Sequence, residues 1–254
     1  MSNHWTRPQL LAALNLYHRT PFGKQHKTYP PIVALAERMG RSPGAVAMKL
    51  SNFTSLDPEE AARGIKGLSG ASKADREIWD EFYQKFEQLA EESEAALEGL
   101  HVPPDDSEST VLPEEIENST AVVKIRRHQR FFRKVILSSY QERCAISGLP
   151  LSELLVASHI KPWAVDPENR LNPRNGLCLA ATYDRAFDRG LIGFNENLEL
   201  QLASRITASK SKTDLHYDVS SVFERFAGNQ LTLPEKNLPD PTLLAWHFEN
   251  VFQN

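Results

Sequence analysis

Apolar side chains recur at helical spacing through the first part of the chain. Those between Leu10 and Tyr17 fall on one helical face, which predicts a short amphipathic helix with Thr6 as its N-cap. Within residues 30–53, apolar positions on both sides of Gly40 predict two helices joined by a tight turn, as in a helix-turn-helix. The second helix would then face DNA, although a small helical core that never touches DNA fits the same spacing. The side chains that it would present are those of Arg41, Ser42, Lys49 and Asn52.

A longer helical pattern runs from Ser72 to about Leu100. Ser72 is suited to cap this helix, and an apolar stripe marks the face that packs against a core or a partner. The stripe consists of Ile78, Trp79, Phe82, Phe86 and Leu89. Residues 101–120 follow with proline, acidic and hydroxyl side chains, which is the composition of an exposed linker. We therefore expect a mainly helical domain at residues 1–100, a linker at 101–120 and a second domain at 121–254.

The second domain opens with a helix whose apolar face includes Phe132 and Tyr140. Further along, the pattern predicts two short strands, at residues 154–157 and 176–180, separated by a loop rich in proline, aspartate and asparagine. A helix that ends at Gly190 follows the second strand, and a hairpin and a closing helix complete the domain. The predicted fold class is therefore α+β, with a strand, loop, strand and helix at the centre of the second domain.

Charge is distributed unevenly, although the whole chain carries a net charge of only −4. Residues 81–120 contain twelve acidic side chains and one Lys, whereas residues 123–163 contain eight Lys or Arg and two Glu. A local basic patch matters more for phosphate binding than the total charge. We therefore expect the helix that opens the second domain to bind the DNA backbone, with an ordinary solvated face as the alternative. Its candidate contacts are Arg126, Arg130, Arg133 and Lys134.

Residues 156–194 concentrate the groups that phosphodiester hydrolysis needs, namely a base, a cation site and a residue that orients the base. His159 follows the first strand, where a histidine held by the backbone accepts a proton near neutral pH. Asp184 and Asp188 are four residues apart on the predicted helix, so their carboxylates share one face. Asn175 begins the second strand and is placed to hydrogen-bond across the loop that carries His159. Each residue alone also fits an ordinary structural role, but their order favours one site.

In this order the residues resemble those of the HNH endonucleases, a nuclease family built on a ββα-metal unit. The resemblance covers residues 126–194. It implies that His159, in "SHIKP", is the general base and that Asn175, in "NPRNGL", is the central asparagine of the motif. The third motif position falls on Asp184, and a further ligand position falls on Asp188. The resemblance therefore implies that the second domain is a ββα-metal nuclease domain.

Three features depart from the family pattern. Asp184 stands where the third motif residue is His, and Ser158 stands before the base, where many members have an acidic or histidine ligand. Cys144 and Cys178 each lack the second cysteine of a Cys-x-x-Cys pair, so a structural zinc ion is not expected. Two carboxylates, a hydroxyl and water make a hard-oxygen site, which suits Mg²⁺ or Mn²⁺. The expected metal ligands are Asp184, Asp188 and Ser158.

These features predict a magnesium-dependent DNA endonuclease of restriction type, in which the first domain selects double-stranded DNA. We expect a homodimer, because one such site cuts one strand. No membrane span or signal sequence is found and only two cysteines occur, so we expect a cytoplasmic protein. The alternative is a DNA-binding regulator or interaction module that has lost catalysis. Further candidate phosphate contacts near the site are Lys161, Arg174, Arg185 and Arg189.

Overall fold

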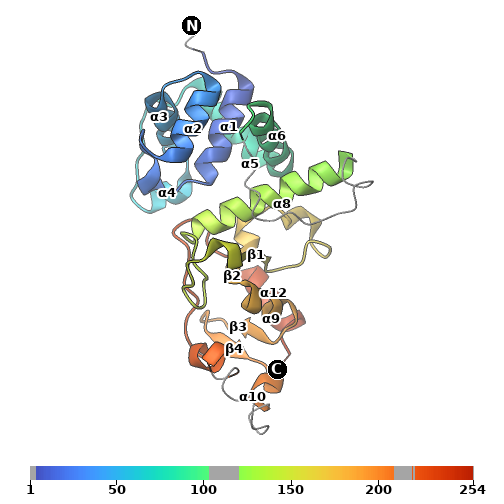
Figure 1. The fold of residues 1–254 in the computed structure, drawn as a ribbon. Coiled ribbons are helices and arrows are strands. Elements are labelled where there is room, and N and C mark those ends of the chain that lie inside the picture. The colour runs from blue at the N-terminus through green and yellow to red at the C-terminus, as the bar shows by residue number, and fades with distance from the viewer. Residues whose placement is uncertain (1–3, 103–119, 209–218, 220, 254) are drawn as a thin grey trace. The chain divides into compact units, whose positions relative to one another are not determined.

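The computed structural model describes residues 4–102, 120–208, 219 and 221–253. It divides into two compact units, Met1–Ser138 and Ser139–Asn254 (Figure 1). The linker expected at residues 101–120 lies, apart from its ends, outside the described residues. Both units contain helices, whereas the strands of the described part of the chain all belong to the second unit.

Helices make up the first unit, as far as the structure describes it. They are α1 (Arg7–His18), α2 (Pro30–Met39), α3 (Pro43–Thr54), α4 (Pro58–Ala62), α5 (Lys73–Gln84), α6 (Phe86–Gly99) and α8 (Thr120–Ser139), with a short 3₁₀ helix at Phe22–Lys24. The N–H of Thr6 donates to Gln9 Oε1 at the start of α1, which satisfies a helix-terminal donor. α1 packs against α2, α3, α5 and α6, and its Leu14 is fully buried. The predicted helical N-terminal region is confirmed.

The helix predicted from Ser72 to about Leu100 is in fact two helices. Lys85 separates α5 from α6 with backbone angles of φ −134° and ψ 49°, which lie outside the helical range. The break lets α6 pack on α1, and it places the Phe82 ring 4.6 Å from the Phe86 ring. Aromatic side chains from both helices share one core. The prediction of a single helix was wrong for this reason.

The expected helix-turn-helix is formed by α2, a three-residue turn and α3. Gly40 ends α2 with a φ of +62°, a left-handed conformation that glycine adopts without strain. Ser42 caps α3, because its hydroxyl accepts a hydrogen bond from the Ala45 N–H. Val46 and Phe53 are fully buried where α3 packs against α1 and α2. The apolar positions on both sides of Gly40 therefore predicted the turn between the two helices.

The basic helix α8 packs against the acidic helix α6 within the first unit. Ion pairs between the described residues of the two helices include Lys124 to Glu91 at 3.0 Å, Arg127 to Glu98 at 2.7 Å and Arg130 to Glu98 at 3.4 Å. The Phe131 ring also lies 5.7 Å from the Phe86 ring. The two oppositely charged stretches of the sequence thus meet in the structure. The second compact unit begins at residue 139, whereas the sequence pattern places the start of the second domain at residue 121.

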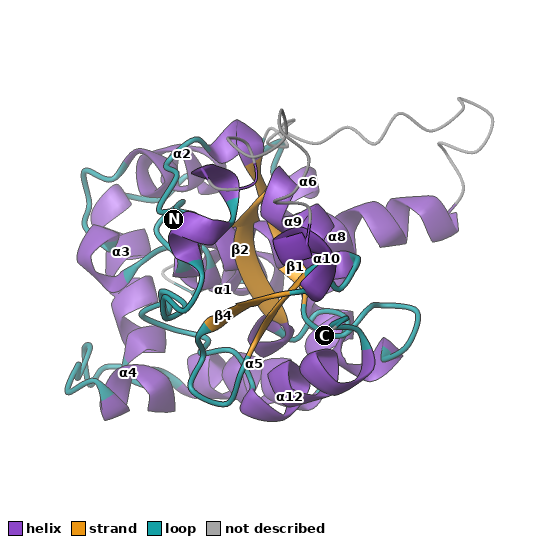
Figure 2. Cartoon of the chain, turned by 90° about the horizontal axis from the view of Figure 1, so that it is seen from below, coloured by secondary structure: helices purple, strands orange, loops and turns teal. Residues whose placement is uncertain are grey.

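The second unit is built around two strands and a helix. Its elements are β1 (Leu155–His159), β2 (Gly176–Ala180), α9 (Ala181–Asp188), β3 (Ile192–Phe194), β4 (Leu200–Leu202), α10 (Ser204–Ala208) and α12 (Pro241–Asn250), with 3₁₀ helices at Ser152–Leu154, Pro167–Asn169, Pro173–Asn175 and Glu224–Phe226. β1 and β2 are antiparallel, with His159 opposite Gly176, and lie side by side in Figure 2. β3 and β4 form a second antiparallel pair. The predicted α+β class is confirmed.

α12 packs on the second unit through His247. The His247 ring stacks on the Phe187 ring with centroids 3.6 Å apart, and its Nε2 donates to the Phe187 carbonyl at 3.1 Å. The side chain is buried, and its Nδ1 has no hydrogen-bond partner among the residues that the structure describes. Burial lowers the pKa of His247 from 6.5 to about 4, against the opposite influence of the Phe187 carbonyl. The fold therefore holds this ring neutral.

Acidification is expected to destabilise the second unit through His247. Its pKa is about 4 in the folded state and 6.5 as an ordinary histidine, so the unfolded chain takes up a proton first as the pH falls. The stability contribution is complete above about pH 6.5 and is lost as the pH falls toward 4, by about 2 kcal/mol at pH 5. Urea unfolding at pH 7.5 and pH 5 measures this loss. His247→Gln is the control, because it has no imidazole to protonate. If this variant lost as much stability between pH 7.5 and pH 5 as the wild type does, His247 would not be the group responsible.

Candidate functional site

His159 is the last residue of β1 and is half-buried. Its Nε2 lies 2.8 Å from the Arg170 carbonyl oxygen. Since a carbonyl only accepts hydrogen bonds, Nε2 carries the proton and Nδ1 keeps the lone pair when the ring is neutral. Burial lowers the pKa of His159 below 6.5, while the Arg170 carbonyl and the Asp184 carboxylate act in the opposite direction. The ring is thus held mainly neutral at pH 7, in one tautomer.

Asn175 is fully buried and joins the two ends of the loop between β1 and β2. Its Oδ1 accepts from the Lys161 N–H at 2.8 Å, and its Nδ2 donates to the Lys161 carbonyl at 3.1 Å. Nδ2 also donates to the Asn169 carbonyl at 3.1 Å. Lys161 is two residues from His159, and Asn169 directly precedes Arg170, whose carbonyl holds the His159 ring. Asn175 therefore fixes the backbone on both sides of the hydrogen bond that orients the histidine ring.

α9 begins directly after β2 and carries both candidate carboxylates. Asp184 is half-buried, whereas Asp188, one turn later, is exposed. Burial raises the pKa of Asp184 above 3.8, and the Ser158 hydroxyl is the largest influence in the opposite direction. Partial burial and then the Asp184 charge raise the pKa of Asp188, although water screens this exposed group. Neither carboxylate forms an ion pair with a described residue, so a bound cation would relieve their mutual repulsion.

Ser158 is the third candidate ligand, and its side chain is buried within β1. It lies opposite Leu177 in the strand register and is 2% exposed. Its Oγ has no hydrogen bond of normal geometry to the residues that the structure describes, yet it is near enough to Asp184 to lower the pKa of that carboxyl. A buried hydroxyl without a partner is unfavourable. This oxygen therefore has lone pairs available for a ligand beside the Asp184 carboxylate.

The donor atoms fit a hard divalent cation. Asp184, Asp188 and Ser158 provide only oxygen donors, which suit Mg²⁺ or Mn²⁺ better than Zn²⁺. Within the described ranges, no group of three His, Cys, Asp or Glu side chains is close enough to hold a metal ion alone. Water and phosphate oxygens would have to fill the remaining positions, as is usual for Mg²⁺. Such a site binds its ion most strongly when a phosphate is present.

Cations around the site differ in their partners. Lys161 Nζ lies 3.2 Å from the carboxylate of Asp166, and it also lies over the Trp246 ring at 5.1 Å. The Arg174 guanidinium lies 3.5 Å from the carboxylate of Asp240, which is the N-cap of α12. One arginine of α9 and the arginine at its C-cap are instead exposed and form no ion pair with any residue that the structure describes. These two are Arg185 and Arg189, which leaves them as the cations of the site without a carboxylate partner.

Candidate DNA contacts in the first unit are placed differently from the expectation. Lys49 is 6% exposed, and its Nζ lies 2.6 Å from the Asp75 carboxylate. The expectation that Lys49 faces a groove is therefore corrected, because a buried aspartate holds it against the core. On α8, Arg133 is 8% exposed. The other α8 candidates are half-buried, and they are Arg126, Arg130 and Lys134. This predicted basic face is thus largely withdrawn from solvent, and Arg130 pairs with Glu98 of α6.

Two features of the site were not expected from the sequence. The Arg170 carbonyl holds His159, but a backbone carbonyl belongs to every residue and carries no signature. The Trp163 ring lies 6.2 Å from the His159 ring, and the Arg170 guanidinium lies 5.6 Å from Trp163. A tryptophan within the turn-rich "KPWAV" segment is the signal that would have drawn attention. The loop is thus ordered around the histidine by groups outside the motif.

Comparison with known families agrees with this geometry. Residues 144–195 match the family model described as HNH endonuclease. The matched segment lies in the second unit and contains β1, β2 and α9. None of the curated proteins compared with the chain matches it, and no helix in the described part of the chain is long and apolar enough to cross a membrane. The match confirms the resemblance seen in the sequence and indicates nuclease-type activity on nucleic acids.

Proposed function

We propose that this protein, whose residues 144–195 belong to the HNH endonuclease family, is a metal-dependent endonuclease of double-stranded DNA. One observation carries the proposal: the Arg170 carbonyl fixes the tautomer of His159, and the unpaired Asp184 carboxylate acts on the same ring. A base beside anionic oxygen donors is the combination that metal-assisted phosphodiester hydrolysis requires. The restriction-type use, in which the first unit selects the DNA, is part of the proposal.

His159 is the general base in the proposed reaction. Its Nδ1 accepts a proton from the attacking water, while its Nε2–H stays on the Arg170 carbonyl. The water oxygen bonds to phosphorus, the bond to the 3′ oxygen breaks, and that oxygen takes a proton from solvent. The products carry a 5′-phosphate and a 3′-hydroxyl. Asn175 is a positioning residue, because it holds the backbone that prevents the ring from turning.

Asp184, Asp188 and Ser158 are the proposed ligands of the divalent cation. Bound there, Mg²⁺ or Mn²⁺ supplies charge neutralisation at the scissile phosphate. Asp184 has a second role, since its charge raises the pKa of His159 and so stabilises the imidazolium that forms when Nδ1 takes the proton. The Ser158 side chain lowers the pKa of the Asp184 carboxyl, so its hydroxyl lies beside that ligand. The three residues therefore combine ion binding with support of the base.

Arg185 of α9 and Arg189 at its C-cap are the proposed phosphate contacts. Both are exposed, and neither forms an ion pair with the residues described in the structure. A guanidinium group donates two parallel hydrogen bonds to phosphate oxygens, which fixes a strand more firmly than a single contact. One site of this kind cuts one strand, so we propose a homodimer for cleavage of both strands.

Plasmid cleavage tests the proposed function. The full chain is incubated with supercoiled plasmid, with or without modified bases, in Mg²⁺, Mn²⁺ or EDTA. Nicked or linear DNA in either metal, together with intact plasmid in EDTA, is the expected result. Plasmid that stays supercoiled under every condition, with protein that still binds it, would instead favour a DNA-binding module without catalysis.

Asp184→Asn is expected to raise the metal concentration required for cleavage by about 10-fold to 100-fold. The substitution removes the charge of a half-buried carboxylate, while it keeps the size of the side chain. Cleavage rates measured against Mn²⁺ concentration give the change. Asp80→Asn is the matched control, because Asp80 is an exposed carboxylate on α5 of the first unit. An unchanged metal requirement in Asp184→Asn would remove Asp184 from the ligand set.

A further inference from the structure

The outward face of α3 is open at its N-terminal half and covered at its C-terminal half. Met48 is 60% exposed on this face, whereas Phe53 is fully buried on the inward side. Gly67 covers the C-terminal half: a Cβ at this position would lie 2.5 Å from the Ser51 carbonyl oxygen. The Leu68 N–H donates to the same oxygen at 3.1 Å. Small residues accompany Met48 in the open half, namely Gly44 and Ala45, with Ser42 at the N-cap.

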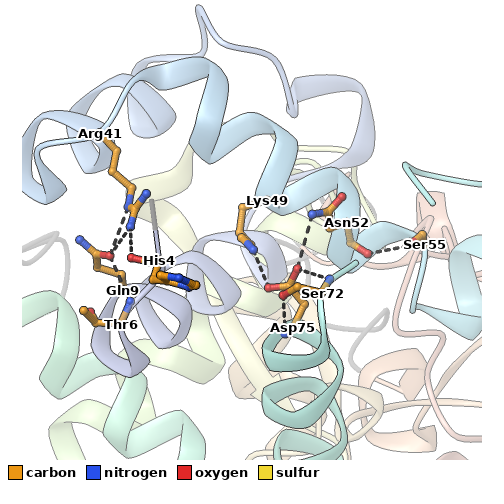
Figure 3. Close-up of polar contacts among 9 residues, drawn as sticks. All are labelled: His4, Thr6, Gln9, Arg41, Lys49, Asn52, Ser55, Ser72 and Asp75. Atoms are coloured by element: carbon orange, nitrogen blue, oxygen red, sulfur yellow. Dashed lines mark hydrogen bonds and ion pairs between the residues drawn. The ribbon is translucent and has the colours of Figure 1, made fainter. Parts of the chain in front are cut away.

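Polar contacts fix α3 without covering this open half. Lys49 Nζ lies 2.6 Å from the carboxylate of Asp75 near the start of α5, as Figure 3 shows. Toward the N-terminal segment, the Arg41 guanidinium and Lys49 Nζ lie over the Trp5 ring at 4.3 Å and 4.9 Å. Arg41 also donates to the His4 carbonyl at 2.6 Å. The helix is therefore held rigidly from its sides, and its protruding side chains remain accessible.

The exposed charged side chains without an ion pair in residues 4–80 are mainly cations, although the whole chain is acidic. Three carboxylates of residues 4–80 are at most 2% exposed, and these are Asp57, Glu60 and Asp75. Exposed cations of the same region that pair with no carboxylate among the described residues are Lys24, Lys27, Arg38, Lys66 and Arg76. The exposed carboxylates without an ion pair there are Glu37 and Asp80. Lys66 belongs to the loop that packs on the C-terminal half of α3 through Gly67 and Leu68, so a cation without an ion pair lies next to that half of the helix.

We propose that α3 is a recognition helix whose open half enters the major groove of duplex DNA. In a helix-turn-helix, the N-terminal residues of the second helix contact base edges, and this half of α3 is the accessible one. Met48 provides an apolar contact of the kind that a thymine methyl group accepts. Lys66 contacts a phosphate, which positions the helix without reading sequence. The proposal rests on the proposed nuclease function only for the choice of duplex DNA as the partner.

Binding of the full chain to a fluorescein-labelled duplex in EDTA tests this surface apart from cleavage. Met48→Glu changes an exposed side chain of the open half, and Lys66→Glu changes an exposed side chain of the loop that covers the other half, so the fold is preserved. Lys85→Glu is the matched control, because Lys85 is an exposed cation at the break between α5 and α6. We expect the dissociation constant to rise about tenfold in each of the first two variants and to stay at the wild-type value in the control.

Three results would overturn the recognition helix. They are wild-type protein that does not bind the duplex at any salt concentration, unchanged affinity in both Lys66→Glu and Met48→Glu, and an equal loss in Lys85→Glu. The proposed nuclease function fails separately, because it is read from cleavage in metal. Tight, α3-dependent binding without cleavage would contradict the nuclease proposal and would support the recognition helix.

Discussion

Replacing His159 by alanine is expected to lower the rate of plasmid cleavage by about 10²-fold to 10⁴-fold. The variant lacks the imidazole whose Nε2–H is bonded to the Arg170 carbonyl, so no positioned nitrogen takes the proton from the attacking water. Asp184 does not replace it, because the role of that carboxylate is to bind the ion and stabilise the imidazolium. Initial rates of nicking in excess Mg²⁺ measure the loss, and circular dichroism shows that the variant is folded.

His26→Ala is the matched control for this experiment. His26 is an exposed loop residue in the first unit, so its removal leaves the site of the second unit intact and should preserve the wild-type rate. Added imidazole is expected to restore part of the activity of His159→Ala, because it supplies the missing base from solution. A His159→Ala rate equal to that of the wild type would remove this residue from the chemistry.

Gly190→Ala is expected to destabilise the second unit by more than about 2 kcal/mol. Gly190 follows α9 with a φ of +65°, and a Cβ there would collide with the Val251 carbonyl oxygen. The backbone cannot easily move away, because the Gln253 N–H donates to the Gly190 carbonyl at 2.9 Å. Strain of the left-handed conformation and the steric clash therefore act together. Urea unfolding at pH 7.5 measures the change.

Gly148→Ala separates these two contributions. Gly148 also belongs to the second unit and has a φ of +70°, but a Cβ there would meet nothing within 4 Å. The expected cost is therefore that of the backbone conformation alone, about 1 kcal/mol. If Gly190→Ala and Gly148→Ala destabilise the protein equally, the C-terminal segment does not pack against Gly190 as the structure has it.

Local patterns were sufficient where neighbouring residues decide the structure. The run at residues 176–180 consists of small and apolar side chains bounded by an asparagine and a helical segment, and it forms β2 as predicted. Gly40 and Ser42 end one helix and begin the next through their own backbone and side-chain chemistry. The α+β class was predictable for the same reason, because the helical patterns come first along the chain and the strand patterns come later.

Long-range pairing explains what local patterns missed. A row of cations on a helix has the same spacing whether it faces phosphates or a second helix, and only the structure shows Arg127 paired with Glu98. Lys49 is likewise buried because Asp75, far along the chain, lies beside it. The break at Lys85 depends on the packing of α6 against α1. Each of these features is set by tertiary contacts, which override local propensity.

The sequence predicted which residues form the site, but it did not predict how their side chains are held. His159, Asn175 and Asp184 stand out because their order and spacing match a chemical requirement. The tautomer of His159 depends on a backbone carbonyl brought close by the loop, and the unpaired state of Asp184 depends on which arginines lie nearby. Neither is encoded by the spacing of side chains along the chain.

Analysis of the ends of cut DNA tests the central claim most directly. End-labelled duplex is incubated with the wild type and with His159→Ala, in Mg²⁺ and in EDTA, and the products are separated on a denaturing gel. We predict fragments with a 5′-phosphate and a 3′-hydroxyl from the wild type in Mg²⁺, and intact strands in every other lane. Intact strands in all lanes, from protein that still binds the duplex, or equal cutting by His159→Ala, would contradict hydrolysis with His159 as the base.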